Sequence, residues 1–269
     1  MIRSVSILLA LGFCLGSCAR DSATSEASSE ASAEASKAEV TASRTAPAES
    51  RAMTLDDILA RHFEALGGEK KLRGVTTMYY AGTKMHGEKT VQVAKYLARG
   101  HKLRVEKRHG DEVSVMAFNG EKGWKQHGKE VKDLPAEKLA GMKYEAAIDD
   151  PLLVYKEEGY ETRLIGEAEV KGAMAYHISQ KVGEMSQERY IDATSFLETK
   201  RVMVWSKEDG EQHKSTVYFS DYRDVGDGMM VNHRVDWESE SGEGHFVIEQ
   251  VSFNQPIDDA KFDLSAGIM

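Results

Sequence analysis

Short runs in which apolar and polar residues alternate dominate the chain from residue 76 onward. Four of them are rich in Val, Tyr and Thr and are separated by the turn-forming HGE, GH and GDE: TTMYYAGTKM, VQVAKYLAR, KLRVEKRH and VSVMAFNG. Such runs predict β-strands, and their close succession predicts an antiparallel meander. Similar runs fill residues 161–253, so we expect about eleven strands in all, within the range of one barrel or one large sheet.

The strands late in the chain carry apolar residues on a shared face. In VNHRVDWE, Val235 and Trp237 lie on one face and charged residues lie on the other. In RVMVW both faces are apolar, with Met203 and Trp205 together on one of them, which predicts that this strand is covered. If these faces point inward, the four residues line an apolar surface suited to acyl chains.

Helical patterns appear before the first strand and again in the middle of the chain. Residues 54–67 place apolar residues at helical spacing between a Thr-x-x-Asp capping pattern and a glycine. Two further segments, LPAEKLAGM and DPLLVYKEEG, carry Pro near the first helical position. Because their apolar sides need burial, we expect these two segments to cover the sheet. Leu152, Leu153 and Tyr155 of the second segment either join the apolar lining or fill the space completely.

The N-terminus has the features of an export signal. Arg3 precedes an apolar run, residues 5–15, that is too short to span a bilayer but has the length of a signal-peptide core. The sequence LGSC at its end, closing with Cys18, resembles the lipobox of bacterial lipoproteins. That resemblance implies cleavage after residue 17 and acylation of Cys18, and two or more acyl chains give a stable membrane anchor. The alternative is an ordinary secretory signal that happens to contain Cys18.

The stretch that follows Cys18 differs sharply from the rest of the chain. Residues 19–52 are almost wholly Ala, Ser, Glu and Thr, without an aromatic residue. Such a segment cannot bury enough apolar surface to offset the entropy of ordering it, which predicts a disordered tether. The chain therefore divides into a signal peptide (1–17), an acylated cysteine with its tether (18–52) and a folded domain (53–269). Ala19 stands where Asp marks inner-membrane retention in enterobacterial lipoproteins, and this resemblance implies the outer membrane, facing the periplasm of a Gram-negative cell.

Charge and motifs disfavour several functions. The chain has 35 basic and 44 acidic residues, a formal charge of −9, which disfavours nucleic-acid binding. After cleavage Cys18 is its sole cysteine, and the nine histidines form neither HExxH nor a zinc-like spacing. The sequence contains neither a GxSxG elbow nor a phosphate-binding GxxxxGK[ST] loop. We therefore expect no metal, no cofactor and no enzymatic activity.

The order of motifs in the folded part resembles that of a known family. The opening helix ends in ALGG and is followed by GVTTMYYAG, a glycine–tryptophan hairpin in NGEKGW, the helical insertion, GEAEVKGAMAYHI, RYIDATSFLETK and a closing KFDL. This order is similar to that of outer-membrane lipoprotein-sorting proteins, relatives of the carriers LolA and LolB, over residues 54–264. The resemblance implies an α+β, mainly antiparallel fold, in which an unclosed barrel or curved sheet is covered by helices over an apolar cavity. It also implies that the cavity holds acyl chains or other lipids, and it carries over no catalytic residue.

Two functions remain open at this point. The first is a membrane-anchored envelope lipoprotein that binds acyl chains, lipid or an acylated protein in an apolar cavity, with a role in outer-membrane lipid or lipoprotein trafficking. Its anchor distinguishes it from LolA, a free periplasmic shuttle, and favours a receiving or holding role. The alternative is a structural or scaffolding lipoprotein with a packed barrel that binds protein partners on its surface. The twelve methionines fit both, since Met adapts to varied apolar shapes and also fills cores.

Overall fold

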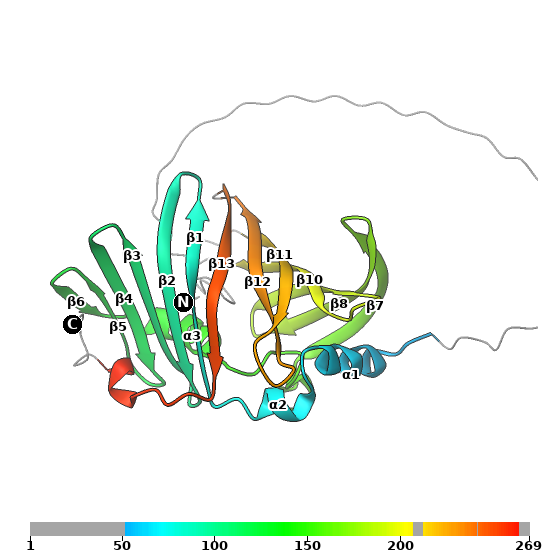
Figure 1. The fold of residues 1–269 in the computed structure, drawn as a ribbon. Coiled ribbons are helices and arrows are strands. Elements are labelled where there is room, and N and C mark those ends of the chain that lie inside the picture. Colours follow the sequence, from blue (N-terminus) through cyan, green and yellow to red (C-terminus); the bar gives the residue numbers. More distant parts are fainter. Residues whose placement is uncertain (1–51, 207–211, 241, 264–269) are drawn as a thin grey trace, which may run out of the picture. The chain divides into compact units, whose positions relative to one another are not determined.

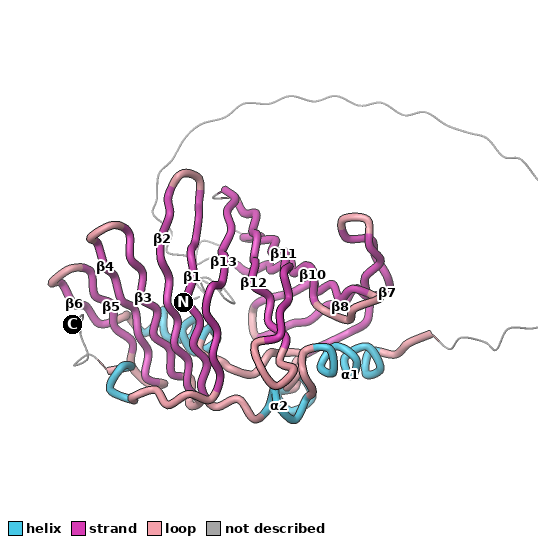
Figure 2. Tube along the Cα trace, in the orientation of Figure 1, coloured by secondary structure: helices cyan, strands magenta, loops and turns pink. Residues whose placement is uncertain are grey.

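The computed structural model describes residues 52–206, 212–240 and 242–263. The expected signal peptide, Cys18 and all of the tether but its last residue lie outside the described residues. Figure 2 shows that β-strands make up most of the described chain. The structure therefore bears on the folded domain that the sequence analysis expects from residue 53 onward.

The described residues form thirteen strands, four α-helices and one 3-10 helix. The strands are β1 Thr77–His86, β2 Lys89–Ala98, β3 Lys102–His109, β4 Glu112–Asn119, β5 Gly123–His127, β6 Glu130–Asp133, β7 Glu161–Val170, β8 Ala173–Val182, β9 Met185–Asp192, β10 Glu198–Ser206, β11 Gln212–Asp224, β12 Met230–Ser239 and β13 Gly242–Phe253. The helices are α1 Leu55–Ala65, α2 Glu69–Arg73, α3 Ala136–Glu145 and α4 Tyr155–Glu158, with the 3-10 helix η1 at Asp259–Phe262. None of these helices has both the length and the apolar character needed to cross a membrane.

All thirteen strands belong to one antiparallel sheet. Its order is β6-β5-β4-β3-β2-β1-β13-β12-β11-β10-β9-β8-β7, so the first and last strands pair with each other in its middle. Within the described residues the edge strands β6 and β7 do not pair, and the sheet is unclosed and curved (Figure 1). This confirms the expected fold class, an α+β and mainly antiparallel unclosed sheet.

The sheet has slightly more strands than the sequence pattern indicates. The additional strands are β5 and β6, which follow the NGEKG turn. All four residues of β6 are exposed, so β6 lacks the apolar alternation on which a strand prediction depends. The helices differ as well: only Tyr155–Glu158 of the segment DPLLVYKEEG is α-helical, and α2 has no counterpart in the sequence-based expectation.

Helix α1 begins with the capping pattern that the sequence contains. The Asp57 backbone N–H donates to Thr54 Oγ1 at 3.2 Å, and the Thr54 backbone N–H donates to Asp57 Oδ2 at 2.9 Å, which closes a capping box. On the buried side of the helix, His62 Nδ1–H donates to the Phe196 carbonyl at 2.7 Å. Because Phe196 lies in the turn between β9 and β10, this bond holds α1 at that end of the sheet.

One face of the sheet, termed the inner face, carries the main hydrophobic core. Its buried residues come from ten strands and from α3 with its C-cap: Tyr80, Val93, Leu97, Leu103, Val105, Phe118, Met142, Ala146, Val182, Met185, Met203, Val217, Val235, Trp237, Phe246 and Ile248. Helix α3 packs on β3 and β4, and the Gln187 side-chain amide in β9 donates to Tyr144 Oη in α3 at 2.6 Å. Because six strands separate β3 from β9 in the sheet, α3 reaches both halves across the inner face.

Candidate functional site

The apolar residues predicted from the strand pattern lie together on the inner face. Met203 and Trp205 stand two residues apart on β10, and Val235 and Trp237 do the same on β12. Met203, Val235 and Trp237 are at most 1% exposed, whereas Trp205 is half-buried and packs against the same core. Strand alternation thus brings all four onto one face of the sheet, where they belong to the same hydrophobic core as residues of α3.

The three residues predicted from the second helical segment lie elsewhere. Leu152 and Leu153 are buried in the turn before α4, but neither belongs to the inner-face core. The Tyr155 hydroxyl donates to Asp56 Oδ1 of α1 at 2.7 Å, so this side chain is directed towards α1. The structure therefore does not bring these three residues together with those of β10 and β12.

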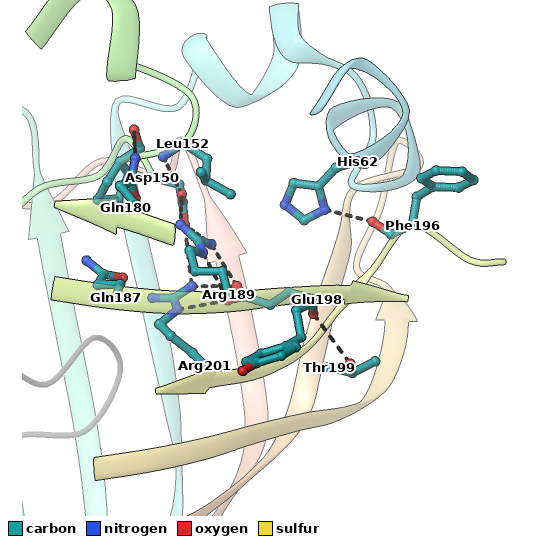
Figure 3. Close-up of polar contacts among 12 residues, drawn as sticks. His62, Asp150, Leu152, Gln180, Gln187, Arg189, Phe196, Glu198, Thr199 and Arg201 are labelled. Carbon is teal, nitrogen blue, oxygen red and sulfur yellow. Dashed lines mark hydrogen bonds and ion pairs between the residues drawn. The ribbon is translucent and has the colours of Figure 1, made fainter. Parts of the chain in front are cut away.

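A group of charges lies on the inner face beside the apolar residues; it is termed the charge cluster and comprises the buried Arg189, Glu198 and Arg201 and the half-buried Asp150 (Figure 3). Arg189 in β9 donates to the Asp150 carboxylate through Nη1 at 2.5 Å and Nη2 at 2.9 Å. Its Nε and Nη2 also donate to Glu198, at 3.0 and 2.7 Å. Arg201 in β10 donates to the same Glu198 carboxylate through Nε at 2.9 Å and Nη2 at 2.5 Å. The charge cluster therefore holds two cations and two anions.

Mutual pairing keeps the buried groups of the charge cluster ionised. Burial by itself raises the pKa of a carboxyl group, but the guanidinium groups of Arg189 and Arg201 outweigh it and hold the pKa of Asp150 and Glu198 below its usual range. Burial also acts against the charged form of Arg189, and the two carboxylates overcome it and raise the pKa of this residue. A neutral set with many short hydrogen bonds is the arrangement in which buried charges are tolerated.

The charge cluster also ties the segment that covers the inner face to the sheet. Asp150 lies in the loop after α3, and its partner Arg189 is two residues along β9 from Gln187, which bonds Tyr144 of α3. Polar bonds at two neighbouring inner-face positions of β9 therefore hold α3 and its loop in place. Beside these bonds, the buried atoms Gln180 Oε1, Gln187 Oε1 and Arg201 Nη1 have no hydrogen-bond partner. An unsatisfied buried group costs about 1–3 kcal/mol, so this part of the inner face keeps spare hydrogen-bonding capacity.

The sequence pattern does not indicate the charge cluster. Asp150 Oδ1 accepts a hydrogen bond from the Leu152 backbone N–H at 2.8 Å and closes a turn, whereas the N-cap of α4 is Val154. The segment QERYIDA does contain a signal for the cluster. Polar residues occupy both faces of this strand, and because one face of the sheet is covered, some of them, such as Arg189, have to be buried. No group of three or more His, Cys, Asp or Glu residues within the described ranges is placed to hold a metal ion.

The fold is similar to those of three solved structures, one of them from the LolA superfamily. A LolA superfamily protein from Nitrosomonas europaea matches with a TM-score of 0.54 and 13% identity, over 80% of this chain and 99% of that chain. A DUF1329 family protein from Desulfovibrio piger matches with a TM-score of 0.53 and 13% identity, over 76% of this chain and 97% of that chain. A domain assigned to outer membrane lipoprotein-sorting proteins, from Vibrio parahaemolyticus, matches with a TM-score of 0.51 and 10% identity. The match covers 78% of this chain and 96% of that chain. The sequence itself matches no protein-family model and no curated protein, so the likeness is one of fold.

Proposed function

We propose that this protein is a lipid-anchored envelope lipoprotein whose inner face binds acyl chains, either as lipid or as part of an acylated protein. The observation that carries the proposal is the inner face, where large apolar side chains from ten strands of an open, curved sheet gather with those of α3 into one apolar core. An acyl chain gains affinity from apolar area removed from water, at about 25 cal/mol per Å². The fold shared with a lipoprotein-sorting domain supports a ligand of this class.

The anchor and the location are part of the same proposal. Acylation of Cys18 attaches the protein to the outer membrane of a Gram-negative bacterium, on the side that faces the periplasm, and residues 19–52 tether the folded domain to it. A tethered domain receives or holds a lipid or an acylated protein near the membrane and does not shuttle freely. We propose binding without catalysis, because the sequence holds none of the nucleophile or phosphate-binding motifs considered above.

Lipid uptake by the purified protein tests this proposal. Extraction and mass spectrometry should identify co-purified lipid, and a fluorescent fatty acid should bind saturably to the delipidated protein in competition with bis-ANS. Trp205→Asp places a charge at a half-buried inner-face position and should weaken fatty-acid binding by about tenfold or more, since burying a large apolar side chain contributes at least about 1.5 kcal/mol. Circular dichroism should show that the strands remain folded.

The neighbouring residue on β10 gives a matched control. Val204 is half-buried like Trp205 but points to the opposite face of the sheet, so Val204→Asp adds the same charge without changing the inner face. This variant should keep the affinity of the unsubstituted protein. Equal weakening by both substitutions, or the absence of saturable uptake, would contradict acyl-chain binding on the inner face.

A second function, structural scaffolding by a packed barrel that binds proteins on its outside, is favoured by a different observation. Met203, Val235 and Trp237 are almost completely buried, which is the arrangement of a filled core. A delipidated protein that takes up no lipid but captures a protein partner through outward-facing residues would support this alternative.

A further inference from the structure

The inner face has a polar end. A depression of about 170 Å³ lies there, termed the β2–β5 depression, and its lining residues are Val91, Lys107, His109, Glu112, Ser114 and His127. They come from the four neighbouring strands β2, β3, β4 and β5. Val91 also packs against the inner-face core, so the depression adjoins the apolar surface on which the proposed function depends.

Strand register places the polar groups of the β2–β5 depression in two adjacent rows. Ser114 in β4 stands opposite Lys107 in β3 and opposite His127 in β5, which gives one row across three strands. Glu112 stands opposite His109 and gives the second row. Side chains opposite each other on one face lie about 4.5–5.5 Å apart at Cβ, so these five groups lie side by side along the open depression, with His109, Glu112 and His127 exposed and Lys107 and Ser114 half-buried.

The depression and α3 occupy opposite ends of the same strands. Gly123, at the start of β5, lies against Leu134 and against Leu139 of α3, where an added Cβ would come within 2.9 and 3.0 Å of the two side chains. His127 of the depression is at the other end of β5. An amphiphile whose chain lies on the inner-face core beneath α3 can therefore extend its headgroup into the depression.

The charges that line the depression have both signs. Lys107 supplies a cation and Glu112 an anion, while the Ser114 hydroxyl and the two imidazoles add further hydrogen-bonding groups. His109 Nδ1–H donates to the Thr90 carbonyl at 2.8 Å, which orients this ring. A purely anionic ligand group would face Glu112 at close range, and a purely cationic one would face Lys107. A group that carries both charges is complementary to the pair.

We propose that the β2–β5 depression binds a zwitterionic aminoalkyl phosphate, the headgroup of an amphiphile whose acyl chains lie on the inner-face core. The phosphate oxygens accept hydrogen bonds from Lys107, Ser114 and His127, and the ammonium group donates to Glu112. This inference rests on the proposed function, because the acyl chains occupy the surface assigned to them there.

A competition between two lipids tests the inference. The full chain carrying Cys18→Ser, and therefore free of its own acyl groups, is incubated with vesicles that contain phosphatidylethanolamine and phosphatidylglycerol in equal amounts and with identical acyl chains. Bound lipid is then extracted and quantified by mass spectrometry. Both lipids carry a phosphate, but only phosphatidylethanolamine carries an ammonium group. We expect about three- to fivefold more phosphatidylethanolamine in the bound lipid, the contribution of one partly exposed ion pair.

Charge-neutral variants then assign the preference to the depression. Glu112→Gln should make uptake of the two lipids equal, whereas Glu121→Gln, which changes an exposed glutamate in the β4–β5 turn, should keep the preference. Lys107→Gln should lower uptake of both lipids, since it removes a phosphate contact that they share. Equal uptake by the unsubstituted protein, a preference for phosphatidylglycerol, or an unchanged ratio in Glu112→Gln would overturn the inference and leave acyl-chain binding in place. A protein that takes up neither lipid would instead contradict the proposed function.

Discussion

Asp150→Asn removes one charge from the charge cluster while preserving the shape of the side chain. It leaves Arg189 and Arg201 facing the single carboxylate of Glu198, and it weakens the two bonds that Arg189 makes to Asp150 at 2.5 and 2.9 Å. The Arg189 side chain is 1% exposed, whereas that of Asp150 is 32% exposed, so solvent screens part of the loss. A hydrogen bond to a charged group contributes about 1.5–3 kcal/mol, and we therefore expect Asp150→Asn to lower the free energy of unfolding by about 1.5–3 kcal/mol, out of the roughly 5–15 kcal/mol typical of a native protein.

The preceding residue provides a matched control for this experiment. Asp149 pairs with Arg99 through bonds of 2.6 and 2.9 Å, so its geometry resembles that of the Asp150 pair. The carboxylates are similarly exposed, 24% for Asp149 and 32% for Asp150, but Arg99 is 41% exposed whereas Arg189 is 1% exposed. A pair in contact with water contributes about 0–1 kcal/mol, and Asp149→Asn should therefore have a small effect. Urea unfolding followed by tryptophan fluorescence measures both variants under the same conditions.

A second substitution separates loss of neutrality from loss of bonding. Arg201→Met removes a cation, so the double variant Asp150→Asn/Arg201→Met has one cation and one anion in the cluster. It should be more stable than Asp150→Asn alone, because no uncompensated buried charge remains. Equal destabilisation by Asp149→Asn and Asp150→Asn, or no recovery in the double variant, would refute the reasoning that buried charge balance determines the stability of this site.

Two further predictions concern pH and the anchor. Burial lowers the pKa of His62, so its stabilising contribution is complete above the unfolded-state pKa of about 6.5 and is lost as the pH falls below that value, by up to about 1.4 kcal/mol per pH unit. His62→Asn, which can keep a hydrogen bond to the Phe196 carbonyl, should flatten the dependence of unfolding free energy on pH between about 6.5 and 5, and an unchanged slope would show that another group titrates there. Cys18→Ser should move the protein from the membrane fraction to the soluble envelope fraction; a variant that stays membrane-bound after high-salt washing would exclude acylation of Cys18 as the anchor.

Strand alternation predicts the inner face well because it is a local property of the chain. Trp205 and Trp237 are assigned to shared faces with Met203 and Val235 from spacing alone, and the structure places all four on the inner face. The same criterion fails for β6, whose residues are all exposed at the edge of the sheet. An edge strand in water needs no apolar alternation, so its sequence resembles that of a polar loop.

The charge cluster escapes sequence reasoning for a different physical reason. Arg189 and Arg201 occupy inner-face positions, yet charged residues on alternate positions ordinarily indicate a face in contact with water. Their burial depends on Asp150, which is 39 residues from Arg189 in the sequence and reaches it only because the loop after α3 crosses the sheet. A pattern confined to one strand cannot contain that information. Tyr155 shows the same limit, since its apolar ring suggests an inner position whereas its hydroxyl binds Asp56 on α1.

The pairing of β1 with β13 has a consequence for the order in which the sheet can assemble. Met78 lies opposite Phe253 in this pair, so the two central strands come from distant parts of the chain. All other neighbours in the sheet are consecutive in sequence, and each can form as a local hairpin or through one intervening segment. Strands β1–β6 and β7–β13 are therefore two meanders that remain separate until the last strand emerges from synthesis. Closing the seam between them requires a contact of high sequence separation, which makes it the slow step and leaves the free edge of β1, an inner strand of the finished sheet, unpaired until β13 has formed.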